Sequence, residues 1–323
     1  MNISILGDGA WGTAIATLLA NNNFQPLLWC YDQEVYQAIK ETRFNNKYLK
    51  DIKLDQNIKV TDNLEYAITN SDIIFEAIPT KYLRSIVQES NKYTSNQPWI
   101  VLSKGIENNS LLFASEIVKD IIKDVNQAII SGPSFAYELA SKQFTSVNLA
   151  TQDKNLALTL KKILDNKYFK VNLTDDMIGT QVCGAFKNII AIILGILDGA
   201  KYSNNTKAFF ITKGLEEMAI LTNSLGGKVE SVYGLSGIGD LVLTATSTES
   251  KNFSLGQQIG VSHILNQDIN NLINKHSTVE GLNTIISIHN LAKIKKIDLN
   301  LVDNLYQIIT NKVNIKELFK NII

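Results

Sequence analysis

The chain has 323 residues, more than one ordinary hydrophobic core accommodates, so two domains are expected. Hydrophobic residues make up 45% and charged residues 19% of the sequence, which is a globular composition. The 31 lysines and arginines balance the 31 aspartates and glutamates. The resulting net charge of zero argues against DNA or RNA as a bulk partner and leaves room for a local basic pocket.

The sequence predicts a cytoplasmic protein without a transmembrane segment. The N-terminus runs straight into a glycine-rich turn and has no basic n-region and no cleavage site, so we expect no signal peptide. The most apolar run, residues 189–197, is far shorter than the roughly 20 residues of a membrane span and reads as a buried helix. Cys30 and Cys183 form no metal-type cluster, so we interpret them as small buried hydrophobes and expect no metal site.

The first half alternates strands with helices. Apolar runs predict strands at residues 3–6, 27–30, 72–78, 99–103 and 128–131, and helical patterns lie at 13–21, 83–90 and 111–123. Buried strands that alternate with helices indicate a parallel sheet covered on both faces. Residues 147–150 and 169–171 are further strand candidates that would extend this sheet. The asparagine and lysine clusters at 21–23 and 45–47 look like solvated loops.

The pattern changes after about Thr174. Strand-like runs disappear, and long helical patterns begin at residues 177–197 and 208–225. We therefore predict an α/β protein with an N-terminal domain at 1–172, built on a parallel sheet, and an all-α domain at 173–323. The helical half is expected to contribute a subunit interface, with a homodimer as the simplest assembly.

A glycine-rich turn follows the first predicted strand. Gly7, Gly9 and Gly12 form the pattern G-x-G-x-x-G at the start of a helix. Gly7 permits a tight turn, Gly9 lets the backbone approach a pyrophosphate, and Gly12 lets the helix pack closely on the strand. The helix N-terminus adds N–H groups and a positive dipole end. This context favours a dinucleotide-binding Rossmann domain over a glycine turn without a ligand.

Asp32 lies about where dinucleotide-binding domains place an acidic residue on the adenosine ribose 2′-OH. It precedes a helical segment at Gln33, and a helix N-cap explains it equally well. The sequence leaves these two interpretations open.

Lys187 has unusual neighbours. Apolar residues follow it at 189–190 and 192–193, so burial should lower its pKa towards the range useful for proton transfer. A lysine that snorkels from a helix end is the alternative. Three further polar segments shift the interpretation towards function, and they lie at residues 103–105, 131–136 and 237–252.

These segments give the chain a family resemblance. It resembles the bacterial NAD(P)-dependent glycerol-3-phosphate dehydrogenases in stretches that occur in family order along nearly the whole chain: residues 7–12, 103–105, 131–140, 185–188, 211–218, 237–240 and 279–281. The resemblance implies interconversion of dihydroxyacetone phosphate and sn-glycerol 3-phosphate, which supplies the glycerophospholipid backbone. The other candidates are a β-hydroxyacid or 6-phosphogluconate type dehydrogenase and a non-catalytic NAD(P)-sensing module.

The resemblance also implies residue roles. Lys187 would be the general acid/base at the C2 oxygen of the substrate, and Lys104 would help hold the substrate and polarise it. Asp240 and Thr244 would orient Lys187 and the substrate. The implied substrate pocket also contains Gly132, Ser134, Ser250, Lys251 and Asn252. The implied dinucleotide contacts are Gly7, Gly9, Ala10, Trp11, Gly12, Tyr31, Asp32, Lys104, Ala136, Lys251 and Glu280.

Two departures from the family pattern affect specificity. Lys251 stands where the family usually has arginine, which keeps the charge and loses the bidentate fork. Tyr31 stands where the family often has arginine or histidine near the 2′-phosphate of NADP. An uncharged Tyr31 beside an acidic Asp32 leans towards NAD, although backbone N–H groups or another lysine could still accept a phosphate.

Overall fold

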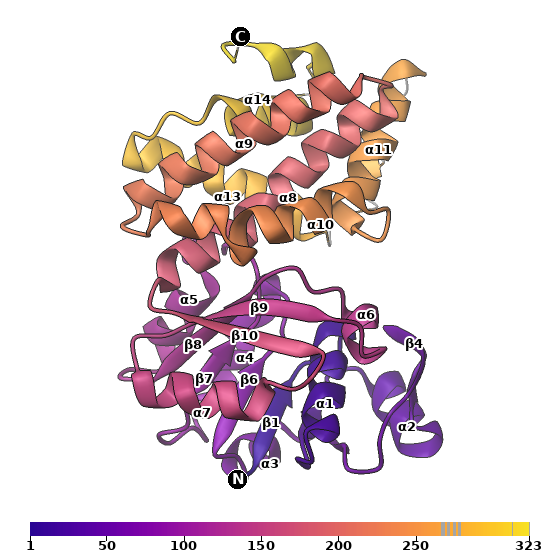
Figure 1. Cartoon of the computed structure of the whole chain (residues 1–323), viewed down its shortest axis with the longest axis vertical. Coiled ribbons are helices and arrows are strands. Elements are labelled where there is room, and N and C mark those ends of the chain that lie inside the picture. Colours follow the sequence, from indigo (N-terminus) through magenta and orange to yellow (C-terminus); the bar gives the residue numbers. More distant parts are fainter. Residues whose placement is uncertain (266–268, 270–271, 274–275, 277–278, 312, 323) are drawn as a thin grey trace. The chain divides into compact units, whose positions relative to one another are not determined.

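The computed structural model describes residues 1–323 except 266–268, 270–271, 274–275, 277–278, 312 and 323, and shows two compact units (Figure 1). The first comprises Met1–Ser103 and Ala114–Met177, and the second comprises Lys104–Phe113 and Ile178–Ile323. Each unit has its own hydrophobic core. The division falls a few residues after the proposed boundary at 172, and it assigns the short segment Lys104–Phe113 to the helical unit.

An eight-stranded sheet forms the centre of the first unit, in the order β10-β9-β8-β7-β6-β1-β2-β5. Its strands are β1 (Ile3–Leu6), β2 (Leu27–Trp29), β5 (Lys59–Thr61), β6 (Ile73–Glu76), β7 (Trp99–Val101), β8 (Gln127–Ser131), β9 (Thr145–Ala150) and β10 (Phe169–Thr174). The predicted strands are confirmed, including the two candidates that extend the sheet. A separate two-stranded ribbon contains β3 (Phe44–Asn45) and β4 (Leu49–Lys53).

The predicted parallel sheet is confirmed except at one pair of strands. β8 and β9 run antiparallel, whereas the other strand pairs of this sheet are parallel. A parallel pair needs a crossover of about a dozen residues, usually a full helix. The β8–β9 connection, residues 132–144, is about that long, but its helix α6 (Ala136–Ala140) has only five residues and does not form a full crossover helix, and the chain turns back on itself.

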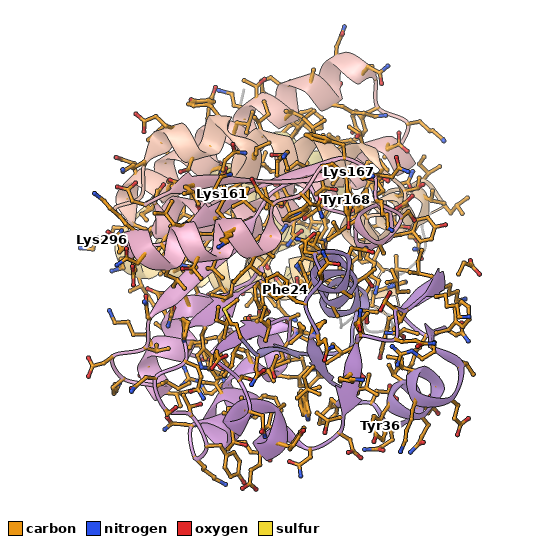
Figure 2. All side chains as sticks on the ribbon, turned by 60° about the horizontal axis from the view of Figure 1, so that its bottom comes forward. Phe24, Tyr36, Lys161, Lys167, Tyr168 and Lys296 are labelled. Carbon is orange, nitrogen blue, oxygen red and sulfur yellow. The ribbon has the colours of Figure 1, made fainter. Side chains whose placement is uncertain are left out.

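Helices cover the sheet in two groups. α1 (Ala10–Asn21) contacts α6 and α7 (Lys154–Leu164), and α4 (Thr80–Ser90) contacts α3 (Leu64–Thr69) and α5 (Ala114–Ile121). Every residue of β1, β6 and β8 is buried, as expected for strands covered on both faces. The amide of Asn21, at the end of α1, donates to the hydroxyl of Tyr168, which Figure 2 labels beside β10.

The second unit is built around one buried helix, α8 (Met177–Gly199). α8 is long and apolar enough to cross a membrane, but 94% of its most apolar window is buried inside the protein, as expected for a core helix. In the part of this unit that the structure describes, the other elements are α9 (Asn204–Ser224), the 3₁₀ helix η1 (Val229–Tyr233), the π-helical turn η2 (Leu235–Gly239), α10 (Asp240–Thr246), α11 (Lys251–Ile264), α13 (Glu280–Lys295), α14 (Asn300–Asn311) and the 3₁₀ helix η3 (Ile315–Phe319).

Glycines bring α8 and α11 into backbone contact. A Cβ atom on Gly195 would lie 2.1 Å from the carbonyl oxygen of Phe253, and one on Gly256 would lie 2.2 Å from the carbonyl oxygen of Ile192. The same clash recurs one turn along, at Gly199 and Gly260. No larger side chain fits at this crossing, so the two helices are held at a fixed, close separation. The crossing fixes the N-terminus of α11 against α8.

Candidate active site

The glycine loop, residues 7–12, joins β1 to α1. Gly7 has φ of +119°, and a Cβ there would lie 2.6 Å from the carbonyl oxygen of Ala77. A Cβ on Gly12 would lie only 2.0 Å from the carbonyl oxygen of Gly7. Both positions therefore require glycine, one for its backbone conformation and the other for close packing of α1 on the loop. These are the two structural roles that the motif predicts.

The third glycine faces open space. Apart from Gly9 and its chain neighbours, no atom of the described residues lies within 4 Å of the Cβ position of Gly9, and none of their side chains caps the first turn of α1. The indole Nε1 of Trp11 is buried with no hydrogen-bond partner within the described residues. An uncrowded glycine at the N-terminus of a 12-residue helix fits a pyrophosphate, because the backbone N–H groups and the helix dipole both attract an anion. The residues present thus fit a dinucleotide.

Asp32 is an N-cap, one of the two interpretations that the sequence leaves open. Its Oδ1 accepts from the backbone N–H groups of Glu34 and Val35 at the start of α2 (Gln33–Thr42). Its own backbone N–H donates to Asp8 Oδ2 over 3.1 Å, which ties this turn to the glycine loop. Tyr31 is 74% exposed. A contact of either residue with a ribose stays a prediction.

A cluster of charged groups lies in the second unit, and we call Lys104, Lys187, Asp240 and Thr244 the lysine cluster. Lys187, on α8, donates to Asp240 Oδ1 and, over 2.9 Å, to Thr244 Oγ1. Lys104 donates to the other carboxylate oxygen, Asp240 Oδ2, over 2.7 Å. Asp240 is 1% exposed and Lys187 7% exposed. One buried carboxylate therefore holds two ammonium groups, and the four residues that the resemblance singles out meet at one place.

Burial lowers the pKa of Lys187 to about 8, and the positive charge of Lys104 acts in the same direction. The negative charges of Asp240 and Glu280 oppose this change and keep the ammonium form accessible. The direction is the one that the apolar neighbours of Lys187 predict. A lysine with a pKa near neutrality can both give and take a proton under ordinary conditions, which is what a general acid/base requires.

The segment of Ser250, Lys251 and Asn252 begins α11. Ser250 caps the helix by accepting from the backbone N–H of Phe253, and the exposed Lys251 is the first helical residue. Asn252 donates to Asn188 Oδ1 over 2.9 Å and accepts from the backbone N–H of Gly281 over 3.1 Å. Asn252 thereby joins α11 to α8 next to Lys187 and to the start of α13, where Glu280 lies.

Gly132, Ser134 and Ala136 lie in the first unit, in the connection that follows β8. A Cβ on Gly132 would lie 2.9 Å from the Cα of Val147, so this turn packs directly on β9. Ser134 Oγ donates to the carbonyl oxygen of Gly132 over 2.8 Å, and Ala136 begins α6. These three residues form a group of their own, and their proposed contacts with substrate and dinucleotide remain predictions.

Sequence reasoning missed two residues beside the glycine loop and took residues 45–47 for a solvated loop. That prediction is wrong for Asn45, which is fully buried on β3 and donates to the carbonyl oxygen of Asp8 and to Thr13 Oγ1, both over 2.8 Å. Lys47 pairs with Asp32. No local pattern marks either residue, because both contacts depend on how the chain returns after α2.

Hydride transfer from a dinucleotide needs a loop that holds the pyrophosphate and an acid that supplies a proton. The glycine loop and the lysine cluster are suited to these two tasks, and they define the class of protein: a dinucleotide-dependent dehydrogenase with a Rossmann-type first unit.

Comparison with known proteins gives the family. Residues 2–157 match the family model for the N-terminus of NAD-dependent glycerol-3-phosphate dehydrogenase, and residues 176–320 match that for its C-terminus. The glycerol-3-phosphate dehydrogenase (NAD(P)+) of Staphylococcus aureus strain bovine RF122 / ET3-1 is 38% identical, over 99% of this chain and 97% of the relative. The chain belongs to the NAD-dependent glycerol-3-phosphate dehydrogenase family and is an NAD(P)-dependent oxidoreductase.

Solved structures of glycerol-3-phosphate dehydrogenases have the same fold as this chain. The crystal structure of glycerol-3-phosphate dehydrogenase from Coxiella burnetii is 31% identical, with a TM-score of 0.92 over 98% of this chain and 97% of that one. The Plasmodium falciparum glycerol-3-phosphate dehydrogenase, at 23% identity, has a TM-score of 0.89 over 99% of this chain and 95% of that one, and therefore shares the fold.

Proposed function

We propose that this protein reduces dihydroxyacetone phosphate to sn-glycerol 3-phosphate with NADH or NADPH, reversibly, in the cytoplasm, and so supplies the glycerophospholipid backbone. The observation that carries the proposal is the lysine cluster, in which one buried carboxylate holds two lysines and the pKa of Lys187 falls to about 8. Family membership supplies the reaction, and the cluster supplies the chemistry that the reaction needs.

Lys187 is the proton donor in this proposal. When bound, the reduced nicotinamide supplies the hydride to C2 of the substrate. Negative charge then develops on the C2 oxygen, and the Lys187 ammonium transfers a proton to it, which leaves a neutral amine and an alcohol. Asp240 and Thr244 hold the Lys187 Nζ through their hydrogen bonds, so the donor keeps one position throughout.

Lys104 stabilises the same developing charge without giving up its own proton. Its Nζ contacts the second oxygen of Asp240, and the cluster of two lysines and one aspartate has an excess of one positive charge when both lysines are protonated. A fixed positive charge in a water-poor site lowers the energy of an oxyanion far more than it would in water. The same charge favours an anionic, phosphorylated substrate.

The phosphate end of the substrate is assigned to the start of α11. Ser250 and Asn252 are fixed by their hydrogen bonds, and Lys251 presents an exposed charge at the helix N-terminus. A helix N-terminus and a lysine both attract phosphate. Gly132 and Ser134 are assigned to the substrate. Ala10, Trp11, Ala136 and Glu280 are assigned to the dinucleotide, and so are the glycine loop, Tyr31, Asp32, Lys104 and Lys251.

The test is the oxidation of NADH or NADPH on addition of dihydroxyacetone phosphate. Turnover with this substrate and none with β-hydroxyacids or 6-phosphogluconate supports the proposal. Turnover only with one of the other substrates would assign the same site to a different dehydrogenase, and tight NAD(P)H binding without any turnover would make the chain a sensing module. The proposed cofactor preference, NADH used at least as well as NADPH, is read from kcat/KM with each cofactor.

A further inference from the structure

The segment after α2 is anchored to the glycine loop by Asn45. The side-chain amide of this buried residue donates to the carbonyl oxygen of Asp8, inside the loop, and to Thr13 Oγ1 on α1. Its Oδ1 accepts from the backbone N–H of Tyr48. The short stretch between Asn45 and Tyr48 is therefore held beside the cofactor loop, and Lys47 belongs to it.

Lys47 reaches the turn that follows β2. Its Nζ lies 2.5 Å from Asp32 Oδ2 and 3.2 Å from Glu34 Oε2. Figure 2 labels Tyr36 on α2, the helix that Asp32 caps. Because Asp32 Oδ1 caps the same helix, both oxygens of this carboxylate are engaged within the protein. The Asp32 carboxylate, which a dinucleotide would meet at this turn, thus forms an ion pair with Lys47.

Both partners are charged. The hydrogen bond from Lys47 lowers the pKa of Asp32, and hydrogen bonds to Asp32 and Glu34 raise the pKa of Lys47 above its ordinary value. The Lys47 side chain is 44% exposed, so its ammonium group remains open to a ligand. Glu34 is 84% exposed, and its contact with Lys47 is of the surface kind that costs little to break.

The Lys47–Asp32 ion pair lies where a dinucleotide-binding fold meets the adenosine ribose. In dinucleotide-binding folds the acidic side chain after the second strand meets the adenosine ribose at its 2′-OH, where NADP carries a phosphate. An unaccompanied Asp32 would accept a hydrogen bond from the 2′-OH and repel the phosphate. A lysine that neutralises Asp32 removes the repulsion and adds a phosphate partner, a role that lysine fills as a point charge.

We propose that Lys47 is the specificity-determining residue through which this enzyme accepts the 2′-phosphate of NADPH, while Asp32 serves the 2′-OH of NADH. The proposal rests on the dinucleotide binding of the proposed function and extends it to a particular pair of side chains. Tyr31, where the family often has a charged residue, is then supplemented by a charge from a different part of the chain. The enzyme accepts both cofactors, and Lys47 sets how well it accepts the phosphorylated one.

The experiment compares 2′,5′-ADP with 5′-ADP, which differ only in the 2′-phosphate, by isothermal titration to the whole protein. Replacing Lys47 by glutamine, Lys47→Gln, removes one charged contact and should weaken 2′,5′-ADP by about tenfold while leaving 5′-ADP unchanged. Lys47→Arg keeps the charge and should bind both ligands as the wild type does. Lys40→Gln removes an exposed lysine from the last turn of α2, away from Asp32, and should change neither.

Steady-state kinetics provide the second measurement. Lys47→Gln should lower kcat/KM for NADPH by about tenfold relative to NADH, since only one cofactor carries the phosphate. Equal loss for both cofactors, or for neither, overturns the role of Lys47, as does an equal effect of Lys40→Gln. If the wild type reduces dihydroxyacetone phosphate with neither cofactor, the proposed function fails instead, and the titration with 2′,5′-ADP still decides on Lys47.

Discussion

The two units of the molecule bind their proposed ligands by different physics. In the first unit the groups that suit a pyrophosphate are backbone N–H groups, made accessible by glycines and a helix N-terminus. In the second unit the reactive groups are side-chain charges, brought together by burial on a single carboxylate. Binding by the backbone depends on glycines that have no side chain, whereas the lysine cluster depends on charged side chains. A substitution in the first unit should therefore weaken ligand binding by adding atoms, and one in the lysine cluster should weaken catalysis by removing a charge.

The largest expected effect separates chemistry from cofactor binding. Lys187→Ala removes the proton donor and should lower kcat by roughly 10²–10⁴-fold, because that is the usual contribution of general acid catalysis. NADH binding, which we assign to the glycine loop, should survive. The measurement is kcat together with an NADH fluorescence titration on the same preparation. Near-normal turnover would remove Lys187 from its assigned role.

The pH dependence of the two reaction directions tests the same lysine without a substitution. Reduction needs the Lys187 ammonium, which is lost as the pH rises above its pKa of about 8 in the free enzyme, so kcat/KM for dihydroxyacetone phosphate should fall about tenfold per pH unit there. Oxidation of glycerol 3-phosphate needs the neutral amine and should fall about tenfold per unit below that pKa.

Lys104→Gln sharpens this prediction. The Lys104 charge contributes to the low pKa of Lys187, so its removal should raise that pKa and move both pH profiles to higher pH. Profiles that are flat from about pH 7 to 9.5 in the wild type would contradict the assignment of Lys187 as acid/base.

Lys251 tests whether charge in the second unit also binds the substrate phosphate. Lys251→Ala should raise KM for dihydroxyacetone phosphate by about 10-fold or more, with some loss of kcat, because remote phosphate binding also positions the reacting carbon. Lys251→Arg should retain activity. The informative comparison uses unphosphorylated dihydroxyacetone as a second substrate, and an equal effect on both substrates would mean that Lys251 does not contact the phosphate.

The smallest effects compare two glycines that differ in what surrounds them. Gly9 has open space where a Cβ would go, so Gly9→Ala should leave the melting temperature unchanged and weaken NADH about tenfold by obstructing the pyrophosphate. Gly195→Ala would place a Cβ 2.1 Å from the carbonyl oxygen of Phe253 and should destabilise the protein. The cost of such overpacking is about 1–3 kcal/mol. Thermal unfolding and NADH titration of both variants test these expectations. A lower melting temperature for Gly9→Ala together with an unchanged one for Gly195→Ala would contradict them.

The sequence predicts the first unit better than the second. Glycine spacing and strand runs are local signals, and β1 and α1 follow from them directly, whereas the sequence offered the N-cap of α2 only as one of two interpretations of Asp32. The antiparallel β9 was not predictable, since a buried strand has the same composition in either direction. Within the first unit, Asn45 and Lys47 escaped notice because their partners lie far away in the sequence.

The lysine cluster was predictable only in part. The apolar neighbours of Lys187 in the sequence predict its lowered pKa. Lys104 and Asp240 lie 136 positions apart, so no local sequence pattern predicts that they meet. Their grouping came from the resemblance to a family. The contact between Asn252 and Asn188 likewise follows from the glycine crossing of α8 and α11, which sequence reasoning did not use.

The sharing of Asp240 by two lysines has an evolutionary consequence. Each oxygen of this carboxylate serves a different ammonium group, so a change at Lys104 alters the charge that Lys187 experiences, and the reverse also holds. Substitutions at such coupled positions do not add, and interaction energies of about 0.5–3 kcal/mol are usual between groups in one network. Asp240, Lys104 and Lys187 thus form an epistatic unit: whether a replacement is tolerated at one of these positions depends on the residues at the other two. Divergence of this site is expected to proceed by concerted changes rather than one residue at a time.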